Sequence, residues 1–227
     1  MITGNVLQRV LRMQCGTEAG SSFTIERNGV QYLVTAKHLF EKQNYPRVTE
    51  IKLLIDGIYQ KFEVEIKYPL DNKIDIAVLK TNPYCELTPK FNTRVSSEGV
   101  ILGQEVYFLG FPFDYERLLV NYPNSNSPVP FVKKATMSGM LTPAPSLMVL
   151  DGYNNPGFSG GPVCFKREND GEFSIAGVVS GYRFGRSPVF EKGSEKELDY
   201  FVKENAGIVN AYDISFAVQI ADEWDEE

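Results

Sequence analysis

Short apolar runs alternate with turn residues along the first half of the chain. The segments Ser22–Glu26 and Val30–Thr35 are joined through Asn28-Gly29, and two β-rich runs around Asn-Gly are a strong signal for a β-hairpin. Lys37–Gln43 is long enough for one short helical turn. Further strands are predicted at three segments: Glu50–Ile55, Ile58–Tyr68 and Ile74–Leu79.

The second half resumes this pattern after a polar connection, Tyr84–Glu98, that has no clear period. An exposed loop is predicted at Tyr122–Pro130, and Ser194–Glu204 is predicted to be helical, as a charged surface insertion, together with the acidic C-terminal tail. Strands are predicted at the following segments: Glu105–Leu109, Leu118–Asn121, Val132–Met140, Leu147–Leu150, Gly161–Phe165, Ser174–Val179 and Gly207–Val218. Many short, closely spaced strands with few helices predict an all-β barrel or sandwich.

Composition and charge narrow the possible partners and location. The 227 residues carry a net charge of −6, which argues against nucleic acid as the main partner because phosphate binding needs clustered Lys and Arg. No apolar run approaches the length of a membrane span, and no signal peptide is evident at the N-terminus. Three widely spaced cysteines and one histidine fit a reducing cytosol and predict neither a metal site nor a cofactor. We therefore expect a cytoplasmic protein with no membrane partner.

The most informative stretch is Asp151–Cys164, in which glycine and proline crowd around Ser159. Glycine allows unusual backbone angles and close approach, and proline fixes one dihedral. A serine held in such a turn presents its hydroxyl beside exposed backbone N–H groups, as acyl transfer requires. The alternative is a glycine-rich hairpin whose serine only caps a turn.

The only histidine, His38, follows an apolar strand and is placed to act as a general base. Asp75 stands among apolar residues in Lys73–Lys80, where a carboxylate is costly unless something pairs with it. A histidine N–H is one such partner, although Asp75 could instead bond its own backbone at the start of a strand. The chain order His, Asp, Ser is incompatible with α/β-hydrolases, whose histidine follows the serine, and with subtilisins, whose aspartate comes first.

Three motifs in this order resemble those of trypsin-like serine peptidases: Thr35-Ala-Lys-His38, Asp75-Ile-Ala-Val-Leu79 and Asn155-Pro-Gly-Phe-Ser-Gly-Gly-Pro162. The third is most similar to the bacterial Deg/HtrA-type branch. The resemblance implies two six-stranded β-barrels of the chymotrypsin type, residues 1–90 and 91–227, with the active site in the cleft between them. No PDZ module is expected after the second barrel.

The resemblance also implies a role for each site residue. Ser159 is the expected nucleophile, His38 the general base and then acid, and Asp75 the group that fixes the histidine tautomer. The backbone N–H groups of Gly157 and Ser159 are expected to form the oxyanion hole. The segment Ser180-Gly181-Tyr182 resembles the edge strand that pairs with substrate, although Val178 just before it equally fits an ordinary core strand.

Two departures distinguish this chain from digestive trypsins. Phe158 replaces the aspartate that pairs with a new N-terminus after zymogen cleavage, so that activation switch is not expected. Tyr153 occupies the position of the acidic floor of the specificity pocket, so a preference for Lys or Arg is not supported. The expected function is an intracellular serine endopeptidase acting on protein or peptide substrates. The alternative is a binding module on the same fold that is inactive, or active only when a partner protein docks.

Overall fold

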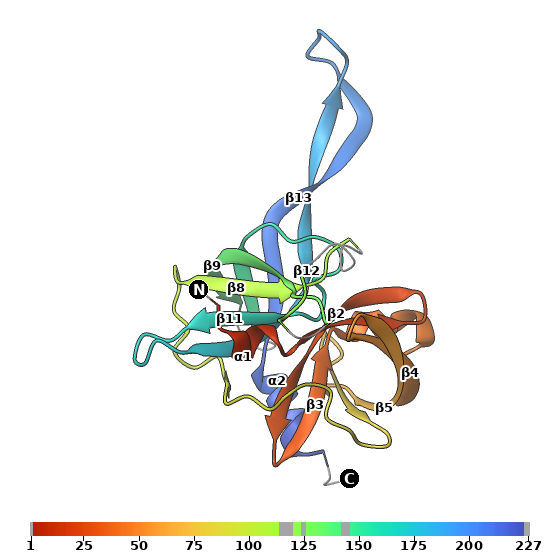
Figure 1. The fold of residues 1–227 in the computed structure, drawn as a ribbon. Helices are drawn as coiled ribbons and strands as arrows, with labels where there is room; N and C mark the ends of the chain where they lie inside the picture. The colour runs from red at the N-terminus through yellow and green to blue at the C-terminus, as the bar shows by residue number, and fades with distance from the viewer. Residues whose placement is uncertain (1, 114–119, 124–125, 142–145, 225–227) are drawn as a thin grey trace.

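The computed structural model describes residues 2–113, 120–123, 126–141 and 146–224. Most of these residues form two antiparallel β units that lie side by side, with a long hairpin projecting from one of them (Figure 1). No helix in the described ranges has the length and apolar character needed to cross a membrane.

The first unit is a closed barrel of six strands in the order β1-β2-β3-β6-β5-β4. Its Asn-Gly hairpin is confirmed, since Asn28 and Gly29 both have positive φ and Arg27 pairs with Val30. Apolar side chains from β1, β3, β4, β5 and β6 form one buried cluster in this unit. The strand bounds are β1 (Val10–Cys15), β2 (Glu18–Arg27), β3 (Val30–Thr35), β4 (Val48–Ile55), β5 (Ile58–Lys67) and β6 (Ala77–Thr81).

The second unit contains six strands in the order β11-β8-β9-β10-β13-β12, and a β11–β12 pairing closes this ring. A short strand, β7 (Arg94–Val95), lies parallel to β12. The all-β prediction of two chymotrypsin-type barrels is therefore confirmed. The bounds are β8 (Glu105–Gly110), β9 (Phe131–Leu141), β10 (Leu147–Asp151), β11 (Pro162–Lys166), β12 (Phe173–Phe190) and β13 (Glu197–Asp213).

A third apolar cluster joins the two barrels to each other. It combines Phe23 and Val34 of the first barrel with Leu109 and Cys164 of the second. The C-terminal helix α2 (Ser215–Asp222) also belongs to this cluster. The relative position of the barrels is thus fixed by buried side chains.

The predicted helix at Ser194–Glu204 is wrong. The segment forms the turn after β12 and the first part of β13, which pairs with the distal half of β12. Its charged residues alternate with apolar residues such as Leu198 and Tyr200, which is the two-residue period of a strand. Pairing with β12 supplies the backbone hydrogen bonds that stabilise the segment as a strand. The strand predicted at Gly207–Val218 ends at Asp213, because α2 begins at Ser215.

The remaining helices are short. The predicted helical turn at Lys37–Gln43 is a 3₁₀ helix, η1, and a four-residue helix, α1 (Gly4–Leu7), precedes the first strand. The predicted strand Leu118–Asn121 falls partly outside the described residues, and Asn121 makes an isolated β-bridge with Pro128.

Candidate active site

His38 and Asp75 come together because their strands are neighbours in the first barrel. Thr35 at the end of β3 pairs with Ala77 at the start of β6, so the residues just beyond these ends face each other. His38 Nδ1 lies 2.7 Å from Asp75 Oδ2, and the His38 backbone N–H donates to Asp75 Oδ1 at 2.8 Å. Both carboxylate oxygens therefore hold one histidine, which fixes its position and makes Nδ1 the protonated nitrogen.

A third group reaches the same carboxylate from the other barrel. The Ser180 hydroxyl on β12 donates to Asp75 Oδ2 at 2.5 Å. The sequence placed Ser180 in a substrate-binding strand but gave no sign of this bond, because the two residues are 105 positions apart. The buried carboxylate thus has the partners that its desolvation requires.

These contacts shift the pKa values of both groups. Burial alone lowers the pKa of His38, but the hydrogen bond and charge of Asp75 outweigh it, so the pKa of His38 is raised above 6.5. Burial alone raises the pKa of Asp75, but hydrogen bonds from His38 and Ser180 and the His38 charge bring the pKa below its ordinary value. Asp75 is therefore a carboxylate at neutral pH.

Ser159 lies in the turn that connects β10 to β11. Two backbone bonds define this turn: Phe158 N–H to Asn155 O at 3.3 Å, and Gly161 N–H to Phe158 O at 2.9 Å. Gly160 has a φ of +83°, and a Cβ added there would lie 2.2 Å from the Ser21 carbonyl oxygen. Only glycine fits this position, which explains the glycine next to the serine.

The Ser159 hydroxyl donates to the Ser180 carbonyl oxygen at 3.2 Å. Within the described residues the hydroxyl makes no hydrogen bond to His38, and the backbone N–H groups of Gly157 and Ser159 have no partner among these residues either. Ser180 consequently touches two of the three predicted triad residues, through its hydroxyl to Asp75 and through its carbonyl to Ser159. The two N–H groups are available as donors.

The nucleophile turn is anchored by Ser21, a fully buried residue of β2. Its backbone N–H donates to Ser159 O at 2.8 Å, and its hydroxyl donates to Gly157 O at 2.7 Å. The same hydroxyl accepts from the Phe111 N–H at 2.9 Å. Sequence reasoning did not identify Ser21, because nothing in its neighbourhood marks a serine that bonds across the barrel interface.

The wall near the predicted specificity pocket carries a cation. Lys133 Nζ on β9 donates to the Tyr153 carbonyl at 2.5 Å and to the Asn155 side-chain oxygen, and lies 5.5 Å from the centroid of the Tyr153 ring. Burial lowers the pKa of Lys133. Phe158 is fully buried and packs edge-on against Phe108, 5.1 Å between centroids. Tyr153, which the sequence predicts at the floor of the specificity pocket, is 59% exposed, and the sequence gives no signal for Lys133.

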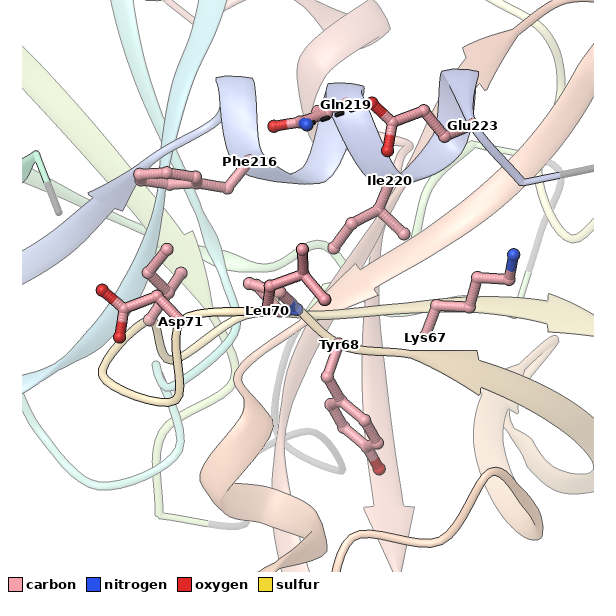
Figure 2. A pocket seen from close by; sticks show the side chains of 10 residues that line it. Lys67, Tyr68, Leu70, Asp71, Phe216, Gln219, Ile220 and Glu223 are labelled. Atoms are coloured by element: carbon pink, nitrogen blue, oxygen red, sulfur yellow. Dashed lines mark hydrogen bonds between the residues drawn. The ribbon is translucent and has the colours of Figure 1, made fainter. Parts of the chain in front are cut away.

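A cavity of about 320 Å³ lies on the loop that leads into Asp75. Figure 2 shows Phe216 and Ile220 of α2 on one side of it and Leu70 and Asp71 of the loop on the other. The last loop residue lining the cavity is Ile74, directly before Asp75. The lining residues come mainly from this loop and from the C-terminal segment around α2, and not from the turn that carries Ser159, so the cavity is separate from that turn.

Comparison with known families settles the relationship of the chain. A family model described as a trypsin-like peptidase domain matches residues 20–172, which include His38, Asp75 and Ser159. The chain belongs to the trypsin-like peptidase family. The predicted resemblance is confirmed, although no curated protein matches the sequence.

Solved structures share the fold of this trypsin-like peptidase domain. HtrA-type protease AlgW with a decapeptide is 16% identical with a TM-score of 0.60, over 98% of this chain and 66% of that chain. Deg5 is 19% identical with a TM-score of 0.58, over 97% and 91% of the two chains. The active form of the Rv3671c protease from M. tuberculosis is 16% identical with a TM-score of 0.58, over 96% and 81%. At these identities the likeness shows a common fold.

Proposed function

We propose that this trypsin-like peptidase domain is a serine endopeptidase that hydrolyses peptide bonds in protein substrates through an acyl-enzyme on Ser159. The observation that carries the proposal is the set of contacts around Asp75, which binds His38 through both oxygens and is linked through Ser180 to Ser159. This arrangement supplies a base with a fixed tautomer, and Ser180 connects its carboxylate partner to a serine in a tight turn.

In the proposed reaction, the Ser159 oxygen attacks the substrate carbonyl carbon while its proton passes to His38 Nε2. Asp75 accepts the bond from Nδ1–H and stabilises the imidazolium without taking the proton. The tetrahedral intermediate then expels the amine, which receives the proton from His38. Water activated by the same histidine hydrolyses the acyl ester and restores Ser159.

The N–H groups of Gly157 and Ser159 are the proposed donors to the oxyanion. Neither N–H group has a partner among the residues that the structure describes, which supports this role because such donors need not break other bonds during the reaction. Losing one such donor costs on the order of 10²–10³ in rate in related systems.

Substrate binding is proposed to bring Ser159 onto His38. The Ser180 carbonyl that now accepts from the Ser159 hydroxyl is also an acceptor for an extended polypeptide lying along Ser180-Gly181-Tyr182. A substrate N–H at this carbonyl competes with the hydroxyl, which then turns to His38. Catalytic hydrogen bonds commonly tighten in this way only once substrate is bound.

The residues near the predicted specificity pocket disfavour a basic residue before the cleaved bond. Tyr153 supplies no negative charge, and the Lys133 amine lies on its carbonyl. We therefore do not expect cleavage after Lys or Arg, since a basic side chain would meet a cation here instead of a carboxylate.

The decisive experiment is labelling with a fluorophosphonate probe, which reacts with serines activated by a base. The wild-type chain should be labelled at Ser159, and Ser159→Ala and His38→Ala should lose the label while keeping the wild-type circular dichroism spectrum. Ser138→Ala, which removes an exposed hydroxyl on β9, is the matched control and should label normally. A folded wild-type chain that remains unlabelled would refute the proposal.

A further inference from the structure

The distal parts of β12 and β13 form a two-stranded arm, residues 183–205, that extends far beyond the second barrel (Figure 1). None of its residues is buried, and several aromatic side chains are exposed on it, including Phe184, Tyr200 and Phe201. The arm therefore contributes nothing to either core. Exposed aromatic residues on a projecting hairpin indicate an interaction surface.

One face of the arm is both aromatic and basic. Arg186 pairs directly with Lys203 across the two strands, and Phe184 and Phe201 lie on the same face, each in a residue pair two positions away along the arm, on either side. Lys203 Nζ lies 3.7 Å from the Phe184 ring centroid, and Arg186 Cζ lies 4.7 Å from that of Phe201. The Phe184 ring in turn packs against Tyr182 at 4.7 Å. We call these five residues the basic-aromatic face.

The acidic residue Glu204 lies on the opposite face of the arm. Glu204 pairs with Gly185 across the strands and accepts from the Ser187 hydroxyl at 2.8 Å. Between Tyr182 and Pro188, the described residues of the basic-aromatic face include no carboxylate. Among the described residues, the ion pair on the arm joins Lys196 to Glu191, and none involves Arg186 or Lys203. Like charges directly opposite each other destabilise a strand pair, so an anionic group bound beside Arg186 and Lys203 would relieve their repulsion.

The basic-aromatic face lies on the continuation of β12, the strand that carries Ser180. The Ser180 carbonyl contacts the Ser159 hydroxyl, and Tyr182, two residues further along β12, begins the face. Arg186 lies six residues beyond Ser180, roughly 20 Å along an extended strand. A polypeptide that pairs with Ser180-Gly181-Tyr182 would therefore reach Arg186 and Lys203 with residues about six positions from the cleaved bond.

We propose that the arm is a second substrate-binding site that selects proteins with an acidic extended segment about six residues from the scissile bond. This inference rests on the proposed function. Charge complementarity favours carboxylates between Arg186 and Lys203, and the aromatic rings provide apolar contact for the intervening side chains. Two cations are too few for a nucleic-acid site, and continuity with Ser180 favours substrate over a second copy of this chain.

The test measures binding to the full chain carrying Ser159→Ala, so that no probe is cleaved. The probe is a fluorescein-labelled 20-residue peptide of Glu, Val, Ser and Gly, with a twin in which every Glu is Gln. The double variant Arg186→Gln/Lys203→Gln should raise the Kd of the Glu peptide about three- to tenfold, the range for two exposed ion pairs. The Gln twin should bind weakly and equally to both chains. Added salt should weaken only the Glu peptide.

The matched control is Lys192→Gln/Lys196→Gln, which removes the same charge from the tip of the arm. It should leave the Kd of the Glu peptide unchanged, and an equal loss in both double variants would overturn the proposal in favour of general charge attraction. Tighter binding of a single-stranded oligonucleotide, or a dimer lost only in the Arg186/Lys203 variant, would overturn it in favour of those occupants. Fluorophosphonate labelling of the chain with Ser159 intact tests the proposed function separately, and its failure would leave the peptide result to stand alone.

Discussion

Ser21 connects the two barrels at the point where the proposed chemistry occurs. Its hydroxyl donates to the Gly157 carbonyl, and Gly157 is also the residue whose N–H is proposed to bind the oxyanion. The hydroxyl also accepts from Phe111, whose carbonyl in turn accepts from the buried Arg12 at 2.7 Å. Ser21 is thus a positioning residue: it touches no substrate but restrains the turn that does.

Replacing Ser21 with alanine should slow fluorophosphonate labelling of Ser159 by about 10- to 100-fold. The Gly157 carbonyl and the Phe111 N–H would each lose a buried partner, which costs about 1–3 kcal/mol and frees the turn to move. The matched control is Ser22→Ala, the next residue along β2, whose buried hydroxyl bonds Leu11 O within the first barrel at 3.3 Å. It should lower the melting temperature similarly but leave the labelling rate unchanged. Equal slowing in both variants would reduce Ser21 to a structural role.

The pH dependence of labelling should report on His38. Protonated His38 cannot accept a proton, so the labelling rate should rise with pH and reach its midpoint above 6.5, because the pKa of His38 is raised. Asp75→Asn removes the hydrogen-bonded charge that raises the pKa and keeps the burial that lowers it, so the midpoint should fall below 6.5. Rate profiles measured from pH 5 to 9 would distinguish these cases, and coincident midpoints would contradict the assigned roles.

The raised pKa of His38 also makes the stability of the fold depend on pH. A histidine whose pKa is higher in the folded state stabilises the fold fully below the unfolded pKa and loses this contribution as pH rises through the folded pKa. Asp75 acts in the opposite direction, since its lowered pKa gives a contribution that disappears only as pH falls below its ordinary range. The pair is therefore most stabilising in mildly acidic solution, while the proposed chemistry needs higher pH.

At the scale of elements, α2 acts across the barrel interface. It follows β13 of the second barrel, but its end packs on the first: the Trp224 ring lies 5.2 Å from that of Tyr32, and Arg27 forms an ion pair with Asp222 at 2.7 Å. Lys67 Nζ also donates to the Trp224 carbonyl at 2.8 Å. The helix thereby fastens the end of one barrel to the outside of the other.

Trp224→Ala should lower the free energy of unfolding by about 3–5 kcal/mol, because Trp224 is 5% exposed and its loss leaves a large cavity against the first barrel. Tyr200→Ala on the arm is the control, since its side chain is 73% exposed and its loss should change stability by less than about 0.5 kcal/mol. Urea unfolding followed by circular dichroism measures both. Equal stabilities would show that α2 does not fasten the barrels.

At the scale of the whole molecule, the sequence predicted what depends on local pattern. The Asn28-Gly29 hairpin follows from turn chemistry, and the two barrels follow from repeated short strands and motif order. The proximity of His38 and Asp75 was predictable because each directly follows or precedes a recognisable strand. The assignment of catalytic roles to these residues remains a prediction.

What the sequence could not predict depends on contacts between distant segments. The bonds of Ser180 to Asp75, of Ser21 to Gly157 and of Lys133 to Tyr153 all join residues that are at least 20 positions apart. A single sequence contains no periodic signal for such pairs. The helix predicted at Ser194–Glu204 is wrong because its charges indicate a solvated surface without deciding the period, and only pairing with β12 makes the segment a strand.

One consequence of the His38–Asp75 contact concerns spectroscopy. His38 is the only histidine in the chain, so every imidazole resonance in a magnetic resonance spectrum belongs to this residue without any assignment experiment. A proton shared between Nδ1 and a carboxylate resonates far downfield of the amide region and exchanges slowly when shielded from water. That single signal would report the binding of a peptide beside His38, in the unmodified chain and without any substitution.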